Sequence, residues 1–196
     1  MIRSGRPVAL AIASLALALV MLLPSELAAN VDVRLSLAEL TRSSTGIATV
    51  TCVERHSEWE GARIITLSRV HVDSVLAGEL PTAEPIVRTL GGSVGRLAQI
   101  VEGEPELAPG SRAVLFLRER TAGGFQVSGR GQGQFPIVAS SEGRPFLVRH
   151  PGLGMLVDLP GRPNAKLTAA VSVLHGLSVD AAQAAIQLAW EKTHAR

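Results

Sequence analysis

Two residues of one expected strand have the types needed for general-base chemistry. His71 and Asp73 are two positions apart in a run from Arg63 to Leu76, so they share one face of a strand, where a carboxylate can orient an imidazole. Ser93 does have the spacing Gly-x-Ser-x-Gly, from Gly91 to Gly95, but we expect no strand-to-helix turn there of the kind that a nucleophile elbow needs, so a nucleophile for this pair would have to come from a distant segment. An outward His/Asp pair is more often solvated surface. We assign no catalytic residue and favour a non-enzymatic role, with a periplasmic hydrolase or peptidase-associated protein as the alternative.

The glycine clusters and the histidines do not form a cofactor or metal motif. The runs Gly91 to Gly95 and Gly129 to Gly133 lack the lysine, the hydroxyl residue and the strand-to-helix context that phosphate-binding loops require. No two of the five histidines have a spacing that joins them as metal ligands on one helix face. We therefore expect neither a cofactor nor a metal site.

The residues with the best prospects for binding are Trp59 and His56, in a hydrophilic stretch from Arg55 to Gly61, and Gly91, Gly92 and Ser93, which open a long loop. Exposed large aromatic residues often anchor interfaces, and long loops are often functional. We predict that these five residues form a binding surface for a protein partner in the cell envelope. The alternative is that Trp59 folds back and closes the barrel.

Hydrophobic periodicity and turn residues predict a mainly β domain. A short helix is expected between Asp32 and Ser44, where Ser36 and Glu39 match a capping box. Strands are expected at 47–54, 63–76, 86–90, 113–117, 125–128, 135–139 and 145–148, and two helices are expected after Pro151, the second capped by Ser178. The run Ala113 to Leu117 is apolar on both faces and should be the central strand.

The long strand predicts a curved sheet. Its inward candidates change from Ile65 and Leu67 to Val70 and Val72, a slip in phase near Ser68 that predicts a β-bulge. A strand of a dozen residues is near 40 Å long at about 3.3 Å per residue, so a small domain must coil it. In the stretch from Gly129 to Gln134, glycine at every second position predicts a strand with one face free of side chains.

The N-terminus predicts export. Arg3 and Arg6 precede an apolar run from Val8 to Leu23, and small residues follow up to Ala29, the order of a signal peptide. We expect residues 1–29 to be cleaved, residues 30–150 to form the barrel with its leading helix, and residues 151–196 to form a linker and helical segment. The protein is then periplasmic or secreted, and the alternative is an envelope protein held by an uncleaved N-terminal membrane anchor.

Net charge and cysteine content limit the classes of partner that we expect. Cleavage lowers Lys plus Arg from 19 to 17 and Asp plus Glu from 17 to 16, a net charge of +1. This near-neutral balance predicts neither nucleic acid nor a membrane surface as partner of the mature chain, and it leaves the oligomeric state open. Cys52 is the single cysteine, so we expect a buried inert thiol, with an intermolecular disulfide or a reactive thiol as alternatives.

Several motifs between Gly46 and Phe135 resemble a group of uncharacterised exported bacterial proteins. They are Trp59, Leu76-Ala77-Gly78, Leu90-Gly91-Gly92, Pro109-Gly110, Val114 to Leu117, and Gln132-Gly133-Gln134-Phe135. The strand order is also remotely similar to the netrin-like barrel of the tissue inhibitors of metalloproteinases, whose N-terminal cysteine and disulfides this chain lacks. The resemblance implies an OB-like barrel and no inhibitory mechanism. We therefore expect an exported binding or scaffolding domain.

Overall fold

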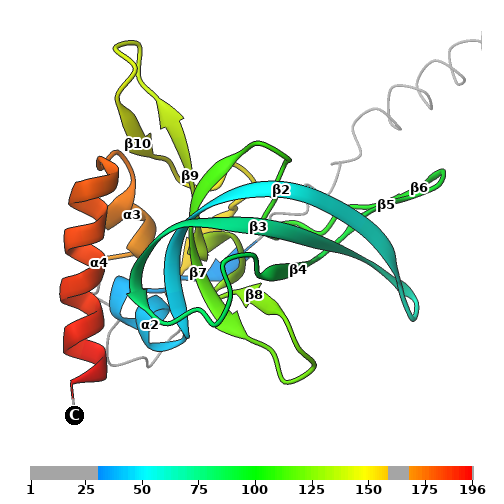
Figure 1. The fold of residues 1–196 in the computed structure, drawn as a ribbon, viewed down its shortest axis with the longest axis horizontal. Coiled ribbons are helices and arrows are strands. Elements are labelled where there is room, and N and C mark those ends of the chain that lie inside the picture. The colour runs from blue at the N-terminus through cyan, green and yellow to red at the C-terminus, as the bar shows by residue number, and fades with distance from the viewer. Residues whose placement is uncertain (1–30, 159–167, 196) are drawn as a thin grey trace, which may run out of the picture.

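The computed structural model describes residues 31–158 and 168–195, which contain a closed barrel of five strands (Figure 1). The barrel strands are β2 (Gly46–Glu60), β3 (Arg63–Gly78), β4 (Ile86–Leu90), β7 (Arg112–Glu119) and β8 (Phe125–Val127). They pair in the order β7-β2-β3-β4-β8, and β8 returns to β7. Only the β4–β8 pairing is parallel among these five, a connectivity that matches the Greek-key OB barrel. The predicted OB-like fold with N-terminal and C-terminal helices is confirmed.

Shorter strands extend the barrel. The expected strands β9 (Gln134–Ala139) and β10 (Pro145–Leu147) continue the sheet beyond β7. Two further pairs were not expected: β1 (Val31–Val33) runs parallel to β11 (Met155–Val157), and β5 (Gly92–Val94) forms a hairpin with β6 (Leu97–Gln99). Strands of three residues are too short to show a periodic pattern.

The β2–β3 hairpin is longer than expected. We predicted a polar connection from Arg55 to Gly61, and this is wrong, because β2 continues to Glu60 and pairs with β3 throughout. Trp59 lies opposite Ile64, one residue pair before the turn at Gly61 and Ala62. The far half of the hairpin projects from the barrel body (Figure 1). Both faces of this projecting half are therefore partly polar, so its composition resembles that of a loop.

Three irregularities curl this hairpin. Leu76 and Asp73 on β3, and Val53 on β2, have no residue opposite them in the pairing. The predicted bulge near Ser68 thus exists, but its extra residue is on β2. The predicted change of phase within β3 is wrong: Thr66 and Ser68, not Ile65 and Leu67, share the inward face with Val70.

Strand β7 separates two apolar cores. Ala113, Leu115 and Leu117 point into the barrel and pack with residues of every other barrel strand, among them Val50, Val70, Val87 and Phe125. Val114 and Phe116 point outward under the helices, where the Phe116 and Phe135 rings lie 6.0 Å apart. These five β7 residues are almost fully buried. The prediction that Ala113 to Leu117 is a central strand buried on both faces is confirmed.

The helices cover the outer core. In α2 (Leu37–Arg42) the predicted capping box of Ser36 and Glu39 is present, and in α4 (Val179–His194) Ser178 is the N-cap as predicted. Both helices and α3 (Ala170–Leu174) share one apolar cluster with barrel strands. Helix α4 continues to His194, whose ring stacks on that of Trp190. Residues 159–167 of the predicted Gly/Pro-rich connection lie outside the described residues.

The glycines from Gly129 to Gly133 form no strand. Residues Arg130–Gly133 are a 3-10 helix, so this prediction is wrong. Close approach of backbone, which the pattern also predicted, does occur: a Cβ on Gly133 would lie 2.0 Å from the Ser128 carbonyl oxygen, and one on Gly131 2.9 Å from that of Gly103. Glycine is therefore needed here for packing of a turn rather than of a sheet.

A charge in the centre of β7 should prevent folding. Leu115 is fully buried in the barrel, so Leu115→Asp leaves an unpaired charge in an apolar core, at several kcal/mol against a typical total stability of about 5–15 kcal/mol. The exposed Leu97 on β6 provides the matched control, Leu97→Asp. Circular dichroism and thermal melting should show the first variant unfolded and the second like wild type. A folded Leu115→Asp protein with unchanged melting would contradict the assignment of β7 as the central strand.

Candidate functional site

A cavity of about 740 Å³ opens at one end of the barrel. It is lined by the projecting part of β2–β3, by the end of β4, by the β5–β6 hairpin and by the segment from Val101 to Leu107. We call it the barrel-mouth cavity. Its volume is within the range of ligand sites in proteins.

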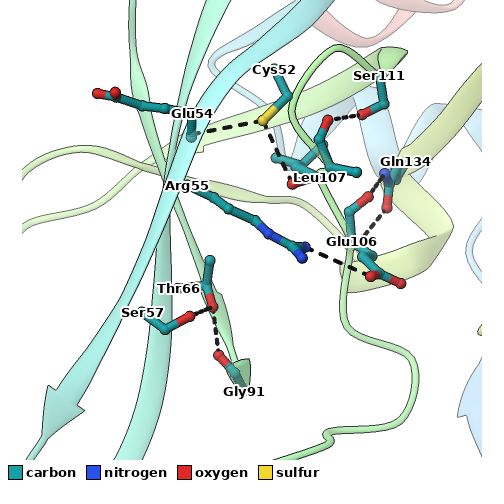
Figure 2. Close-up of polar contacts among 11 residues, drawn as sticks. Cys52, Glu54, Arg55, Ser57, Thr66, Gly91, Glu106, Leu107, Ser111 and Gln134 are labelled. Atoms are coloured by element: carbon teal, nitrogen blue, oxygen red, sulfur yellow. Dashed lines mark hydrogen bonds and ion pairs between the residues drawn. The ribbon is translucent and has the colours of Figure 1, made fainter. Parts of the chain in front are cut away.

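Hydroxyl groups line the inner wall of the barrel-mouth cavity. The Ser57 and Thr66 hydroxyl oxygens are 2.8 Å apart, and Thr66 donates to the Gly91 carbonyl oxygen at 2.7 Å (Figure 2). Ser68 and Thr89 lie beside them on β3 and β4, at 1% and 6% exposure, and neither hydroxyl forms a hydrogen bond within the described residues. The wall therefore offers free hydroxyl groups to whatever enters the cavity.

Glycines bring the β5–β6 hairpin against this wall. Gly91 and Gly92 have φ angles of 89° and 129°, so the chain leaves β4 sharply, as the glycine pair predicted. A Cβ on Gly92 would lie 2.3 Å from Thr66 Oγ1 and 2.4 Å from Ser57 Oγ. The Gln99 side chain accepts a hydrogen bond from the Ile64 amide at 2.8 Å and fixes the second strand of the hairpin to β3.

An arginine with unusual backbone geometry holds the opposite wall. Arg130 has a φ of 55°, a conformation that ordinary residues rarely adopt. It donates to Glu104 at 2.8 Å, to Asp32 at 3.2 Å, and to the Glu102 carbonyl oxygen. Glu104 also accepts from the Leu90 amide at 3.0 Å. One guanidinium therefore connects the N-terminal strand, the loop over the cavity and the end of β4.

Arg55 is the cationic group of the cavity wall that reaches across the mouth (Figure 2). Its guanidinium lies 3.7 Å from the Glu106 carboxylate, and both side chains are well exposed. The Glu106 backbone is fixed from the other side, because its amide donates to the Gln134 side chain at 2.9 Å and its carbonyl oxygen accepts from it at 2.6 Å. The loop position is thus rigid while the ion pair across the mouth is loose.

Cys52 lies beneath the cavity as a structural residue. Its thiol is almost fully buried and lies 3.6 Å from the Leu107 carbonyl oxygen. Burial raises the pKa of this thiol, and the positive charge of Arg55 offsets only part of the effect. A protonated buried thiol is a poor nucleophile, which agrees with the expected inert cysteine.

The structure brings most of the predicted binding residues together. His56, Gly91, Gly92 and Ser93 all line the barrel-mouth cavity. Trp59 lies further along β2, half-exposed near the hairpin tip; this side chain does not close the barrel.

Sequence reasoning missed Arg55, Thr66, Ser68, Thr89 and Glu106. A signal existed for the hydroxyls: Thr66 and Ser68 alternate with Ile65 and Leu67, which marks a polar stretch on one face of the strand.

The His71 and Asp73 pair is not assembled. The Asp73 carboxylate accepts from the Thr51 hydroxyl at 3.0 Å and from Arg112 at 3.2 Å. His71 Nδ1 instead lies 4.0 Å from Glu84. The arrangement fits the solvated-surface interpretation of this pair.

A second depression, of about 580 Å³, lies on the outer face of β3 and β4. Ile65, Leu67 and Ile86 contribute apolar surface to it. Its charged residues are the carboxylates of Glu58, Glu60, Glu84 and Glu119 and the guanidinium groups of Arg88 and Arg120. The excess of carboxylates makes this face unfavourable for phosphate groups.

The described part of the chain has neither a metal-binding cluster nor a membrane-spanning helix. Residues 31–158 and 168–195 contain no group of three or more His, Cys, Asp or Glu side chains placed to hold a metal ion. Within these ranges no helix has both the length and the apolar character that crossing a bilayer requires. The predicted signal segment, residues 1–29, lies outside them.

The close approach of Gly92 to β2 and β3 can be tested with a paired glycine. In both Gly92→Ala and Gly95→Ala the new side chain meets a positive φ, at a cost of roughly 1–2 kcal/mol, but only at Gly92 does it also meet other atoms; nothing lies within 4 Å of a Cβ on Gly95. We expect the melting temperature to fall clearly more for Gly92→Ala. Equal melting temperatures of the two variants would show that β5 does not pack on Ser57 and Thr66.

The buried His150 side chain should make the folded protein less stable in acid. The ring is 4% exposed, both nitrogens lack partners within the described residues, and it packs against Gly131 and Gly152. Burial lowers its pKa, and the negative charge of Glu106 opposes this only in part. The unfolded chain therefore binds a proton more readily, so the stability contribution is complete above the unfolded pKa of about 6.5 and is lost as the pH falls below it.

We accordingly expect the melting temperature of the wild type to fall between pH 7.5 and pH 5.5, and the fall to be smaller for His150→Gln. The exposed His56, as His56→Gln, should keep the wild-type dependence. If His150→Gln shows the same pH dependence as wild type, the buried ring is not the responsible group.

Comparison of the chain with protein-family models, with curated proteins and with solved structures finds no match in any of the three. The resemblance to exported bacterial proteins stays an expectation, and a role has to be inferred from the geometry of the site.

Proposed function

We propose that this chain is an exported, non-enzymatic binding or scaffolding domain that captures a protein partner of the cell envelope at the barrel mouth. One observation carries the proposal. Two hairpins, β2–β3 and β5–β6, project from the same side of the barrel (Figure 1) and present exposed apolar residues on either side of the barrel-mouth cavity.

The apolar residues concerned are Trp59 at 49% exposure, Leu97 at 60% and Ile100 at 86%. Large apolar side chains that are exposed on projecting elements are candidates for an interaction surface. A protein partner suits them better than a small molecule, because Trp59 and Leu97 lie outside the cavity lining and Ile100 is largely exposed at its rim.

The charged residues around the cavity support binding rather than catalysis. Glu104 and Arg130 hold the loop and the end of β4 in place, and Glu106 and Arg55 face each other across the mouth. The contacts of Glu104 and Arg130 give a rigid framework, which reduces the entropy lost when a partner binds. Export of the domain is inferred from the basic, apolar and small-residue order of residues 3–29.

Trp59→Ala tests the proposal. Truncation of an aromatic anchor costs about 2 kcal/mol or more, which weakens binding about thirtyfold. We expect immobilised Trp59→Ala to lose proteins that the wild type captures from an envelope extract, with an unchanged melting temperature. Quantitative mass spectrometry of the captured proteins provides the measurement.

The matched control is Leu188→Ala on α4, an exposed apolar residue on an element that does not line the cavity, which should keep both capture and stability. A large drop in the melting temperature of Trp59→Ala, with capture intact, would instead make Trp59 part of the folding core.

A further inference from the structure

The projecting half of β2 has one open edge. On the side of β7, β2 pairs from Gly46 to Thr51, and the backbone of Cys52 still bonds with Ser111 and Gly110. From Val53 to Glu60 the backbone pairs only with β3 within the described residues. At about 3.3 Å per residue, these eight residues present roughly 26 Å of unpaired strand edge.

The neighbouring loop does not close this edge. Leu107 and Gly110 contact Cys52, but the Gln134 side-chain amide bonds both backbone groups of Glu106 and so directs them away from β2 (Figure 2). A slot therefore remains between the edge and the loop. The Arg55 guanidinium and the Glu106 carboxylate face each other across this slot at 3.7 Å. The slot opens into the barrel-mouth cavity, which both residues line.

The groups around Arg55 are suited to an incoming carboxylate. Arg55 is opposite Ser68 in the pairing of β2 and β3, and Ser68 and Thr89 line the cavity with hydroxyls that form no hydrogen bond in the described part of the chain. The carboxylate that faces Arg55 now is Glu106, at a distance longer than a hydrogen bond and with a 74% exposed side chain. An exposed pair of this kind contributes little energy, so another carboxylate can replace Glu106.

We propose that an extended acidic segment of a partner protein adds to the open edge of β2 as a further strand and places a carboxylate on Arg55 in the position that Glu106 now approaches. The inference rests on the proposed function and names the kind of segment that is bound. Main-chain hydrogen bonds to β2 supply affinity, and the contact with Arg55 supplies selectivity, as in other cases of strand addition.

The sequence of the edge limits what can pair there. Val53 forms a bulge, and Glu54, Glu58 and Glu60 carry charge along the strand, which are features that protect natural edges from unspecific pairing. A strand rich in carboxylates throughout would be repelled by these residues. We therefore expect one acidic side chain opposite Arg55 among otherwise neutral residues, rather than a polyacidic segment.

The test uses random ten-residue peptides displayed on phage and selected in parallel on wild type and on Arg55→Glu. We expect wild type to enrich peptides with Asp or Glu at one fixed position, and Arg55→Glu to enrich Lys or Arg at the same position. A synthetic copy of the best wild-type peptide should bind at least about tenfold more weakly to Arg55→Gln, because a charge-assisted hydrogen bond is lost. Melting curves confirm that both Arg55 variants are folded.

Strand addition is tested on the same peptide with N-methyl groups at alternate positions, which keep the side chains and remove amide donors. One of the two alternating N-methyl patterns should abolish binding, and the other should reduce it less. Equal binding of the methylated and unmethylated peptides, or enriched sequences without a fixed acidic position, would overturn the inference.

The outcomes separate this inference from the proposed function. If Trp59→Ala loses partner capture while Arg55→Glu selects the same peptides as wild type, the binding surface stands and the acidic strand does not. A second copy of the chain is the other occupant of the edge. Sedimentation of the peptide-free protein as a dimer that Arg55→Glu converts to a monomer would assign the edge to self-association and overturn the acidic partner segment.

Discussion

The antiparallel pairing of β2 with β3 is the interaction on which the rest of the structure depends. Strands of 15 and 16 residues cannot remain flat in a small barrel. The unopposed residues Leu76, Asp73 and Val53 bend the pair, so that its first half becomes barrel wall and its second half projects beyond β7. The cavity, the open edge and the position of Trp59 all follow from a hairpin that is longer than the barrel it helps to close.

The stability of that arrangement comes from β7. Its inner residues fill the barrel, and its outer residues meet the helices, so one strand joins two apolar cores. Neither core contains a disulfide, because Cys52 is the single cysteine and stays free. The free energy of unfolding is concentrated where the apolar contacts are. The barrel mouth can therefore carry polar, loosely paired groups without much loss of stability.

Local chemistry was readable from the sequence and non-local geometry was not. The capping box at Ser36, the bounds of β4 and the sharp exit at Gly91 and Gly92 each depend on residues within a few positions of one another, and each was predicted. The cavity wall depends on the register of three strands, which places Ser57 opposite Thr66 and Thr66 opposite Thr89. The pairing register of these strands cannot be read from the spacing of residues in the sequence.

The stretch from Arg55 to Glu60 shows why composition misleads at such a place. A strand that leaves the barrel no longer buries one face, so it loses the alternation of apolar and polar residues that identifies strands in sequence. The same loss of alternation makes the segment useful, because its backbone groups stay accessible. Errors of sequence interpretation are thus expected where a strand serves binding instead of the core.

The change from core to cavity occurs within one step of the register on three neighbouring strands, since Arg55 and Ser68 are level with Val87, and Thr66 is level with Thr89. Along the inner face, Cys52 on β2 is followed by Arg55 and Ser57, Val70 on β3 gives way to Ser68 and Thr66, and Val87 on β4 gives way to Thr89. Below this level the barrel is filled with hydrocarbon side chains. Above it the Ser57 and Thr66 hydroxyls bond with each other and with the Gly91 carbonyl oxygen. The Ser68 and Thr89 hydroxyls form no hydrogen bond within the described residues, so covering them is unfavourable unless a partner supplies hydrogen bonds. A ligand without polar groups at this depth would leave these two hydroxyls unpaired, so the wall discriminates against purely apolar ligands. It favours a ligand that carries hydrogen-bond donors and acceptors, as a peptide backbone does.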